Sequence, residues 1–196
     1  MIARLFALAV GVLGLAALRA QYDALLPPVS GQSLSDQLWF LAGFFTILTN
    51  LLVTVHMLAL ARGWTISASR AAGLVVAMVM VAIVYHAVLA RQWQPVGLAW
   101  WADQGLHTAM PLATLLWWLG FAPKTVTRRD LPYWLIWPTV YAIYALIRGA
   151  LTGFWPYPFL DATALGWPVV ALTLAGMLAG FAALGFGLIA VARRSG

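Results

Sequence analysis

The fold is decided by residues 71–90, which read AAGLVVAMVMVAIVYHAVLA. Tyr85 and His86 are the only ionisable side chains in this stretch. The hydrocarbon core of a bilayer is about 30 Å thick, and a helix needs about 20 mostly apolar residues to cross it. Residues 71–90 therefore predict a transmembrane helix.

The whole chain shares this apolar character. Of its 196 residues, 64% are hydrophobic and 8% are charged, and the mean hydropathy is +0.92. Soluble domains carry about 25% charged residues, so this composition excludes a soluble enzyme, a disordered protein and a nucleic-acid-binding module. The net charge of +6 comes from eleven Lys and Arg residues spread thinly along apolar sequence, which is typical of membrane topology.

The supply of reactive side chains is small. The sequence has no cysteine and no glutamate, and it has five aspartates and three histidines. A disulfide framework, a thiolate metal site and a cysteine nucleophile are therefore excluded. We expect no metal and no cofactor, and each ionisable group inside the membrane becomes a candidate for function.

Six stretches are long and apolar enough to span a membrane: Leu5–Tyr22, Leu38–Ala61, Ala71–Ala90, Trp101–Phe121, Tyr133–Gly149 and Gly166–Val191. Proline, glycine and charged residues separate them, beginning with the segment from Pro27 to Ser35. We predict an all-α integral membrane protein with six transmembrane helices in a single domain, residues 1–196. The first stretch follows Arg4 as a signal peptide would, but residues 18–20 fit a cleavage site poorly, so we expect this helix to be retained.

The distribution of basic residues predicts the orientation, because cytoplasmic loops are enriched in Lys and Arg. With both termini inside, eight basic residues are cytoplasmic: Arg4, Arg62, Arg70, Lys124, Arg128, Arg129, Arg193 and Arg194. Three are outside: Arg19, Arg91 and Arg148. We predict an N-in, C-in protein of the inner (plasma) membrane, with tryptophans such as Trp39 and Trp155 as anchors at the outer interface.

Polar residues of the second and fourth spans converge in the outer half of the predicted bundle. Thr46 lies about 12 Å and His107 about 9 Å below the outer ends of their spans, at 1.5 Å of rise per residue. Thr46, Thr49 and Asn50 share one helix face by their spacing. They are either helix-packing residues that bond to backbone carbonyls or neighbouring helices, or part of a reactive site.

The histidines allow similar alternatives. Asp103, four residues before His107, could orient its ring as a carboxylate orients a catalytic base, or His107 could be a buried structural residue. His86, which follows Tyr85, is predicted at a similar depth and facing the bundle interior. A His86–His107 pair could ligate a haem in an electron carrier, and a transporter or ligand-binding protein without chemistry is a further alternative.

A rigid, aromatic loop follows the fifth span. It lies between Arg148 and Asp161 and contains Tyr157 and two prolines. We expect Arg148 to pair with Asp161 or Asp103, because an unpaired guanidinium near the membrane is unfavourable. The loop is either an interfacial cap or a lid over a cavity that recognises part of a substrate.

Five short motifs carry a resemblance to a known family. They are FFTILTN at 44–50, VYH at 84–86, HTAMP at 107–111, RGA at 148–150 and WPYPFLD at 155–161. In this order they resemble the bacterial Pr-six-Pr family of six-span membrane proteins. The resemblance covers spans two to six, and the last motif is the most specific.

The same motifs are more distantly similar to the androgen-induced and androgen-dependent transmembrane hydrolases of animals, which cleave fatty acid esters of hydroxy fatty acids. In that family, a threonine shortly before an asparagine is the nucleophile, and a histidine four residues before a proline is the base. These positions match Thr46 and His107, with Thr49 as a competitor for Thr46.

This resemblance implies hydrolysis of a membrane lipid or another hydrophobic ester. Thr46 would be the nucleophile and His107 the base. Asn50, Tyr85 or Arg148 would be donors to the oxyanion. The substrate would enter from the outer leaflet of the bilayer.

Overall fold

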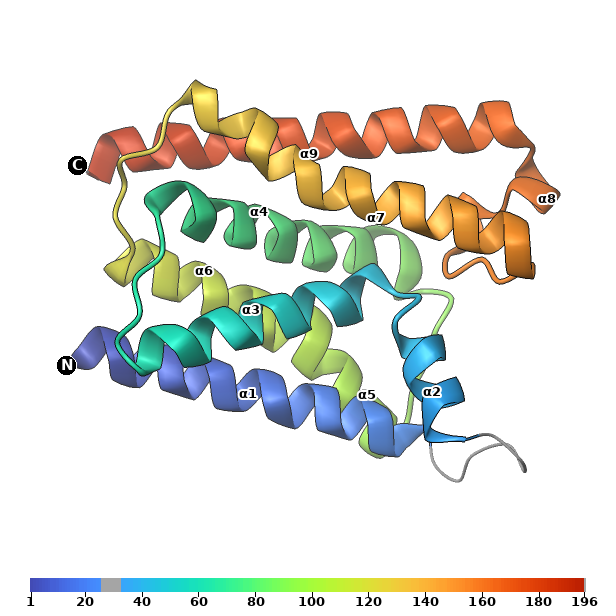
Figure 1. Cartoon of the computed structure of the whole chain (residues 1–196), viewed down its shortest axis with the longest axis horizontal. Helices are drawn as coiled ribbons and strands as arrows, with labels where there is room; N and C mark the ends of the chain where they lie inside the picture. Colours follow the sequence, from blue (N-terminus) through green and yellow to red (C-terminus); the bar gives the residue numbers. More distant parts are fainter. Residues whose placement is uncertain (26–32, 196) are drawn as a thin grey trace.

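The computed structural model describes residues 1–25 and 33–195, and these residues are helical or irregular, without strands. Most of the break predicted between Pro27 and Ser35 lies outside the described residues. The long helices run side by side, and short helical segments cross one end of the bundle (Figure 1).

The helices are, in order, α1 (Ile2–Ala24), α2 (Leu34–Leu41), α3 (Phe45–Ala61), α4 (Ala68–Val84), α5 (Leu98–Gln104), α6 (Met110–Phe121), α7 (Leu131–Thr152), α8 (Ala162–Leu165) and α9 (Trp167–Ser195). Two π-helical turns extend them, Tyr85–Leu89 after α4 and Gly105–Ala109 between α5 and α6. Two 3₁₀ turns, Arg128–Asp130 and Pro158–Leu160, precede α7 and α8.

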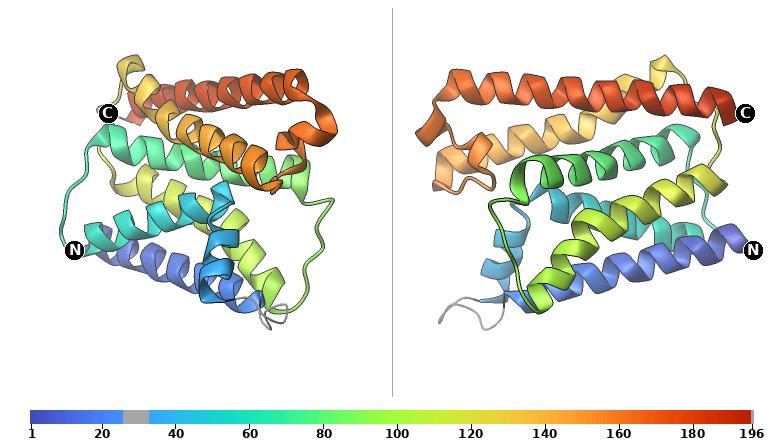
Figure 2. Two further views of the ribbon diagram at one scale, coloured as in Figure 1. Left: turned by 45° about the vertical axis from the view of Figure 1, so that its right-hand side comes forward. Right: turned by 180° about the vertical axis from the view of Figure 1, so that it is seen from behind.

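The stretch that decides the fold forms the centre of the bundle. Helix α4 packs against α3, α6, α7 and α9. In its most apolar stretch of 18 residues, half of the residues are buried, whereas the share is 22–28% in the three other long apolar helices. Figure 2 shows α5 and α6 behind this centre, where they cross α1 and α4. The remaining hydrophobic surface faces outward, as a helix bundle in lipid requires.

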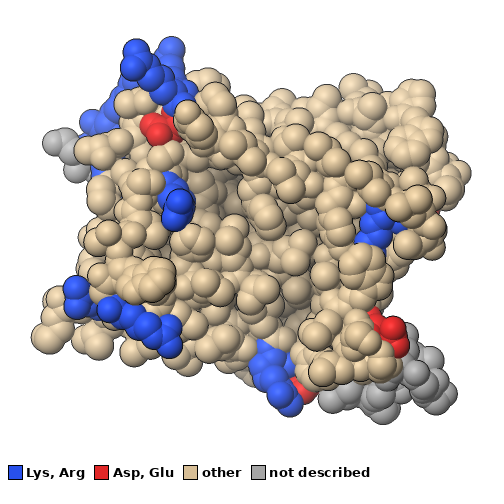
Figure 3. Space-filling model, in the orientation of Figure 1, with Lys and Arg blue, Asp and Glu red and all other residues tan. Residues whose placement is uncertain are grey.

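The two ends of the bundle differ. Both termini and the connections 62–67 and 122–127 lie at one end, which we call the terminal end (Figures 1 and 2). Helices α2 and α8 and the connection 90–97 lie at the other, which we call the site end. Figure 3 shows most Lys and Arg side chains on the visible face at the terminal end.

Four helical stretches are long and apolar enough to cross a membrane: Ile2–Ala24, Ala68–Leu89, Arg128–Thr152 and Trp167–Arg194. Helices α2 and α3 together make a fifth if a bend of 94° is accepted within one span. Residues 98–121 are helical throughout, but the π-helical turn divides them into shorter helices. The architecture is thus that of an all-helical, apolar protein with four or five candidate spans.

The prediction of one unbroken span over Leu38–Ala61 is wrong, because the chain bends sharply at residues 42–44. Partners from α7 stabilise the bend: Tyr144 donates to the Ala42 carbonyl at 3.1 Å and Tyr141 to the Gly43 carbonyl at 2.8 Å. A Cβ atom at Gly43 would lie 2.5 Å from the Phe154 ring, so only glycine fits this close approach. The bend aims the first turn of α3 at the site end.

Helix α1 belongs to the bundle and packs closely on α3. A Cβ atom at Gly14 would lie 2.0 Å from the Thr54 hydroxyl oxygen. Small residues in membrane helices allow such close backbone approach. The helix that could have been read as a signal peptide is therefore an integral layer of the described structure.

Candidate functional site

A cavity of about 420 Å³ opens at the site end, between the bend, the two π-helical turns and the aromatic loop. Five residues singled out from the sequence line it: Thr46, Tyr85, Asp103, His107 and Tyr157. The rest of the lining is largely apolar and includes Phe40, Phe44, Leu106 and Trp93. The fold thus brings together residues that are up to 111 positions apart in the chain.

Asp103, His107 and Tyr85 form one hydrogen-bonded and stacked cluster. The Nδ1 atom of His107 lies 3.2 Å from Asp103 Oδ1 and 3.1 Å from the Asp103 carbonyl oxygen. The Tyr85 hydroxyl donates to Asp103 Oδ2, and its ring stacks on the His107 imidazole at 3.9 Å between centroids. Asp103 is 3% exposed, so the carboxylate is removed from water, but it keeps His107, Tyr85 and Gln104 as partners.

This arrangement selects one tautomer of His107. Both partners of Nδ1 are acceptors, so Nδ1 carries the proton and, in the neutral ring, the lone pair is on Nε2. Orientation of an imidazole by a buried carboxylate is the arrangement that a general base requires. Tyr85 and His107 both lie in π-helical turns, an irregularity that is frequent at functional sites.

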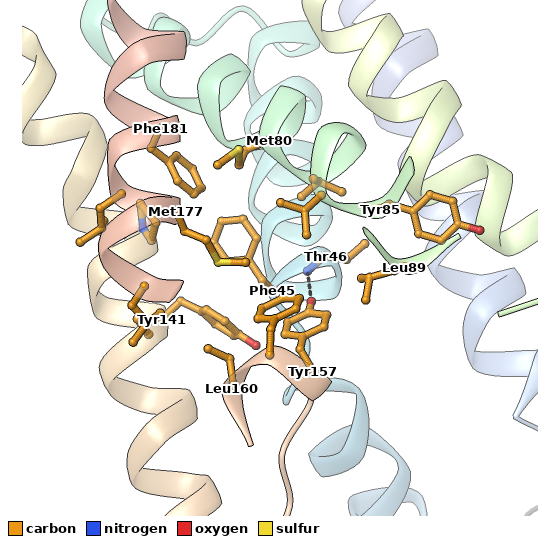
Figure 4. A pocket seen from close by; sticks show the side chains of 17 residues that line it. Phe45, Thr46, Met80, Tyr85, Leu89, Tyr141, Tyr157, Leu160, Met177 and Phe181 are labelled. Carbon is orange, nitrogen blue, oxygen red and sulfur yellow. Dashed lines mark hydrogen bonds between the residues drawn. The ribbon is translucent and has the colours of Figure 1, made fainter. Parts of the chain in front are cut away.

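Thr46 lies in the first turn of α3. Its side chain is buried, and its backbone N–H donates to the Tyr157 hydroxyl at 3.4 Å (Figure 4). Phe44, the residue before α3, provides no side-chain cap to this helix. The positive end of the helix dipole therefore lies beside Thr46, with no capping side chain from Phe44.

An apolar pocket adjoins the cavity and shares Thr46, Tyr85, Leu89 and Tyr157 with it. It is narrow, about 70 Å³, and lies between α4, α7 and α9. Figure 4 shows its wall of large apolar side chains, among them Phe45, Met80, Leu160, Met177 and Phe181. Thr46 is thus placed where the cavity that holds Asp103 and His107 meets a hydrocarbon-lined pocket.

Thr49 and Asn50 diverge from Thr46. The Thr49 hydroxyl accepts a bond from the Trp137 indole N–H at 3.0 Å, on the α7 side. Asn50 donates to the carbonyls of Thr46 and Leu106 at 2.9 and 3.2 Å. Neither of these residues lines the cavity or the apolar pocket.

Of the three expected oxyanion donors, Asn50 and Tyr85 are already engaged, and Arg148 does not line the cavity. The amide hydrogens of Asn50 and the hydroxyl hydrogen of Tyr85 are directed to other acceptors. The Tyr157 hydroxyl accepts from the Thr46 backbone N–H and also interacts with the side chains of Thr46 and Tyr141. The sequence identified Tyr157 as part of a lid, but its contact with the first turn of α3 was not foreseeable from spacing.

The prediction that His86 faces the bundle interior is wrong. Its side chain is exposed, and its Nε2 atom lies 3.1 Å from the Thr108 hydroxyl, which itself donates to Gln104. His86 follows Tyr85 directly, and the two successive side chains point in different directions, with Tyr85 taking the interior position. Within the described residues, no three His or Asp side chains come close enough to hold a metal ion.

The prediction that Arg148 pairs with Asp161 or Asp103 is also wrong. Arg148 is 6% exposed, and its guanidinium lies between the rings of Trp39 and Phe154, 4.1 and 4.5 Å from their centroids. Its Nη1 atom donates to the Tyr144 hydroxyl at 3.0 Å, and its Nε atom has no partner among the described residues. We call Arg148, Trp39, Phe154 and Tyr144 the arginine clamp.

Asp161 has a different task, which explains why it is unavailable to Arg148. Its carboxylate accepts bonds from the backbone N–H groups of Thr163 and Ala164 and from the Thr163 hydroxyl, and so caps α8. The Thr163 hydroxyl bond lowers the pKa of Asp161. Asp161 therefore fixes the end of the aromatic loop rather than contacting the cavity.

Most partners in the arginine clamp were missed in the sequence. Trp39 reads as an interface anchor, and Phe154 and Tyr144 carry no signal that separates them from other aromatic residues. Comparison of the chain with protein-family models, characterised proteins and solved structures finds no match to any of them.

Proposed function

We propose that this protein hydrolyses a lipid ester within the membrane, with Thr46 as nucleophile and His107 as general base. We further propose six transmembrane spans, cytoplasmic termini, an inner-membrane location and membership of the bacterial Pr-six-Pr family. The basic residues gathered at the terminal end support this orientation. The π-helical turn within residues 98–121 leaves that stretch helical enough to act as a span.

One observation carries the proposed activity. A buried carboxylate orients His107 in a cavity that Thr46 also lines. A threonine hydroxyl needs an adjacent base to become a nucleophile, and the Nε2 lone pair of His107 supplies one. Of the three histidines, only His107 contacts a carboxylate within the described part of the chain.

The reaction proceeds in two balanced steps. The Thr46 oxygen attacks the ester carbonyl carbon, its proton passes to His107 Nε2, and the alcohol leaves with that proton to give an acyl-threonine. Water then attacks the acyl group, gives a proton to His107, and Thr46 leaves with that proton as the acid is released. Asp103 stabilises the imidazolium that forms in each step.

The surroundings of Thr46 fit a lipid substrate. The apolar pocket between α4, α7 and α9 accommodates part of an acyl chain, and the larger cavity accommodates the remainder of the ester. The negative charge on the carbonyl oxygen develops near the first turn of α3, where the positive end of the helix dipole and the Tyr157 hydroxyl lie. In this proposal, these groups stabilise the oxyanion in place of the three side chains expected from the sequence.

A second candidate function is the binding of a ligand in the same cavity without any reaction. No hydrogen bond joins Thr46 to His107 among residues 1–25 and 33–195, and this observation favours binding alone. Catalytic hydrogen bonds often form only when the substrate is bound, so the two candidates are separated by experiment. Fluorophosphonate labelling does this, because the probe reacts with an activated hydroxyl.

The experiment compares two threonines with the protein purified in detergent. We expect the fluorophosphonate to label wild type at Thr46, as identified by mass spectrometry of the modified peptide. Thr46→Ala should abolish labelling, and Thr49→Ala should keep it, because Thr49 is bonded to Trp137 away from the cavity. If neither wild type nor Thr49→Ala is labelled, the result favours the binding protein. If labelling survives in Thr46→Ala, the result contradicts the proposed nucleophile.

A further inference from the structure

A second cavity, unrelated to the candidate site, lies toward the terminal end between α3, α4 and α7. It is an open groove of about 650 Å³. Helix α4 packs against both α3 and α7 and lines the groove from between them. The groove shares no lining residue with the cavity or the apolar pocket at the site end, and His56 lies about 15 Å along α3 from Thr46.

Polar side chains line one part of the groove. They are His56, Ser67, Ser69, Arg70 and Tyr133. Arg70 is exposed and forms no ion pair with a carboxylate among the described residues. His56 donates from Nδ1 to the Leu52 carbonyl at 2.7 Å, which leaves Nε2 without a partner within the same residues.

Hydrocarbon lines the rest of the groove. This part is formed by Leu52, Leu74, Ala77, Trp134 and Trp137. The indole N–H groups of Trp134 and Trp137 are bonded to Ser69 and Thr49, so the groove meets the apolar surface of these rings. One cavity therefore offers a basic, hydroxyl-rich part and an apolar part, which matches the two parts of a lipid.

The electrostatics of this end favour an anion. Helices α4 and α7 both begin here, so their positive dipole ends and Arg70 act together. Ser67 accepts from the Arg70 backbone N–H at 3.1 Å and keeps its hydroxyl hydrogen as a donor. The neighbouring acid, Asp130, is bonded to Ser69, which lines the groove, and to the backbone and hydroxyl of Thr127. The anion is therefore assigned to Arg70, Ser67 and Tyr133 and not to Ser69.

We propose that this groove binds an amphiphile with an anionic phosphate headgroup. Arg70 and the hydroxyls of Ser67 and Tyr133 hold the phosphate, and the acyl chain lies against Leu52, Ala77 and Trp137. Charge-assisted hydrogen bonds from arginine to phosphate are among the strong ones in proteins. The site lies at the membrane surface opposite to the candidate hydrolase site, so its occupant is not the substrate of that site.

Native mass spectrometry of the detergent-purified protein tests this proposal. Phosphatidylglycerol and phosphatidylcholine with the same acyl chains are titrated separately, and bound lipid is counted. We expect one phosphatidylglycerol to bind more tightly than phosphatidylcholine, and Arg70→Gln to weaken its binding roughly tenfold. Arg62→Gln is the matched control, because Arg62 is an exposed arginine at the same end that does not line the groove.

Further measurements test which side chains hold the lipid and whether a phosphate without an acyl chain can replace it. Tyr133→Phe should weaken phosphatidylglycerol binding less than Arg70→Gln, and both residues are exposed, so neither variant disturbs the core. Inorganic phosphate and glycerol phosphate at equal concentration should not displace the lipid. Displacement by either, equal binding of the two lipids, or unchanged binding in Arg70→Gln would overturn the proposal.

Discussion

Lys124 at the terminal end and Arg148 at the site end are both cations that lie over aromatic rings, and they are held in different ways. At the terminal end, Lys124 lies 4.2 Å from the Trp118 ring centroid and donates to the carbonyls of Trp118 and Ala122. At the site end, Arg148 lies between two rings and donates once, to the Tyr144 hydroxyl. Neither cation is paired with a carboxylate in the part of the chain that the structure describes.

The difference shows what each cation does. Lys124 donates to carbonyl groups at the end of α6, and its side chain is partly exposed. Burial lowers the pKa of Lys124, as expected for an ammonium group partly removed from water. Arg148 instead joins α7 to α2 and to the aromatic loop, and it keeps a buried N–H unused. The cation at the terminal end binds the carbonyl groups at the end of a helix, whereas the cation at the site end holds irregular backbone in place.

The largest expected effect is on the chemistry of the site end. Asp103→Asn keeps the shape of the side chain but removes the charge that stabilises the His107 imidazolium. We expect the rate of fluorophosphonate labelling to fall roughly a hundredfold or more. Asp23→Asn, which removes a surface carboxylate paired with exposed Arg19, should leave the rate unchanged. A wild-type rate in Asp103→Asn would mean that the Asp103–His107 pair is structural.

A second comparison uses glycines at the two ends. In Gly43→Ala the new methyl group would meet Phe154 at 2.5 Å and Arg148 at 2.8 Å, so we expect about 1–3 kcal/mol of destabilisation from overpacking. Gly120→Ala, near the terminal end of α6, meets nothing within 4 Å and should be neutral or stabilising by about 0.5–1 kcal/mol. Thermal denaturation in detergent measures both. Equal stabilities of the two variants would show that the bend is not closely packed.

The smallest effect comes from exchanging the cations. Arg148→Lys loses the contacts of the guanidinium with the rings of Trp39 and Phe154, and we expect it to destabilise the fold by about 1–2 kcal/mol. Lys124→Arg keeps donors for the end of α6 and should change stability by about 0.5 kcal/mol or less. The same denaturation assay compares them. A larger loss in Lys124→Arg would reverse the distinction between the two cations.

The sequence predicts the long helices well, because an apolar stretch long enough to cross a bilayer indicates a helix without knowledge of its tertiary contacts. Residues 71–90 fall on α4 and its π-helical turn, and the fifth and sixth predicted spans fall on α7 and α9. The bend at residues 42–44 was missed, because no local signal other than Gly43 marks it. Its stabilising partners, Tyr141 and Tyr144, are about 100 residues away in the chain.

The depth of a residue along its helix predicts its neighbours less well than the apolar stretches predict the helices. Thr46 and His107 do line one cavity, as their matched depths indicate. Depth does not give rotation about the helix axis, so His86 was predicted to face the interior and Thr49 to compete with Thr46 as the nucleophile. The charge argument for Arg148 failed for a different reason: aromatic rings, which carry no formal charge, surround this guanidinium where carboxylates were expected.

The two π-helical turns have a consequence for how this chain can vary. A π-helical turn has about one residue more than an α-helical turn, so deleting one residue from 105–109 would restore a regular helix. Because the wider turn absorbs the extra residue, the helix on both sides would keep nearly its present faces, including those of Asp103 and Met110. Only the residues within the turn, His107 among them, would change direction. Deletion of a single residue here is therefore a change that would reassign which side chains enter the cavity without altering the register of the core.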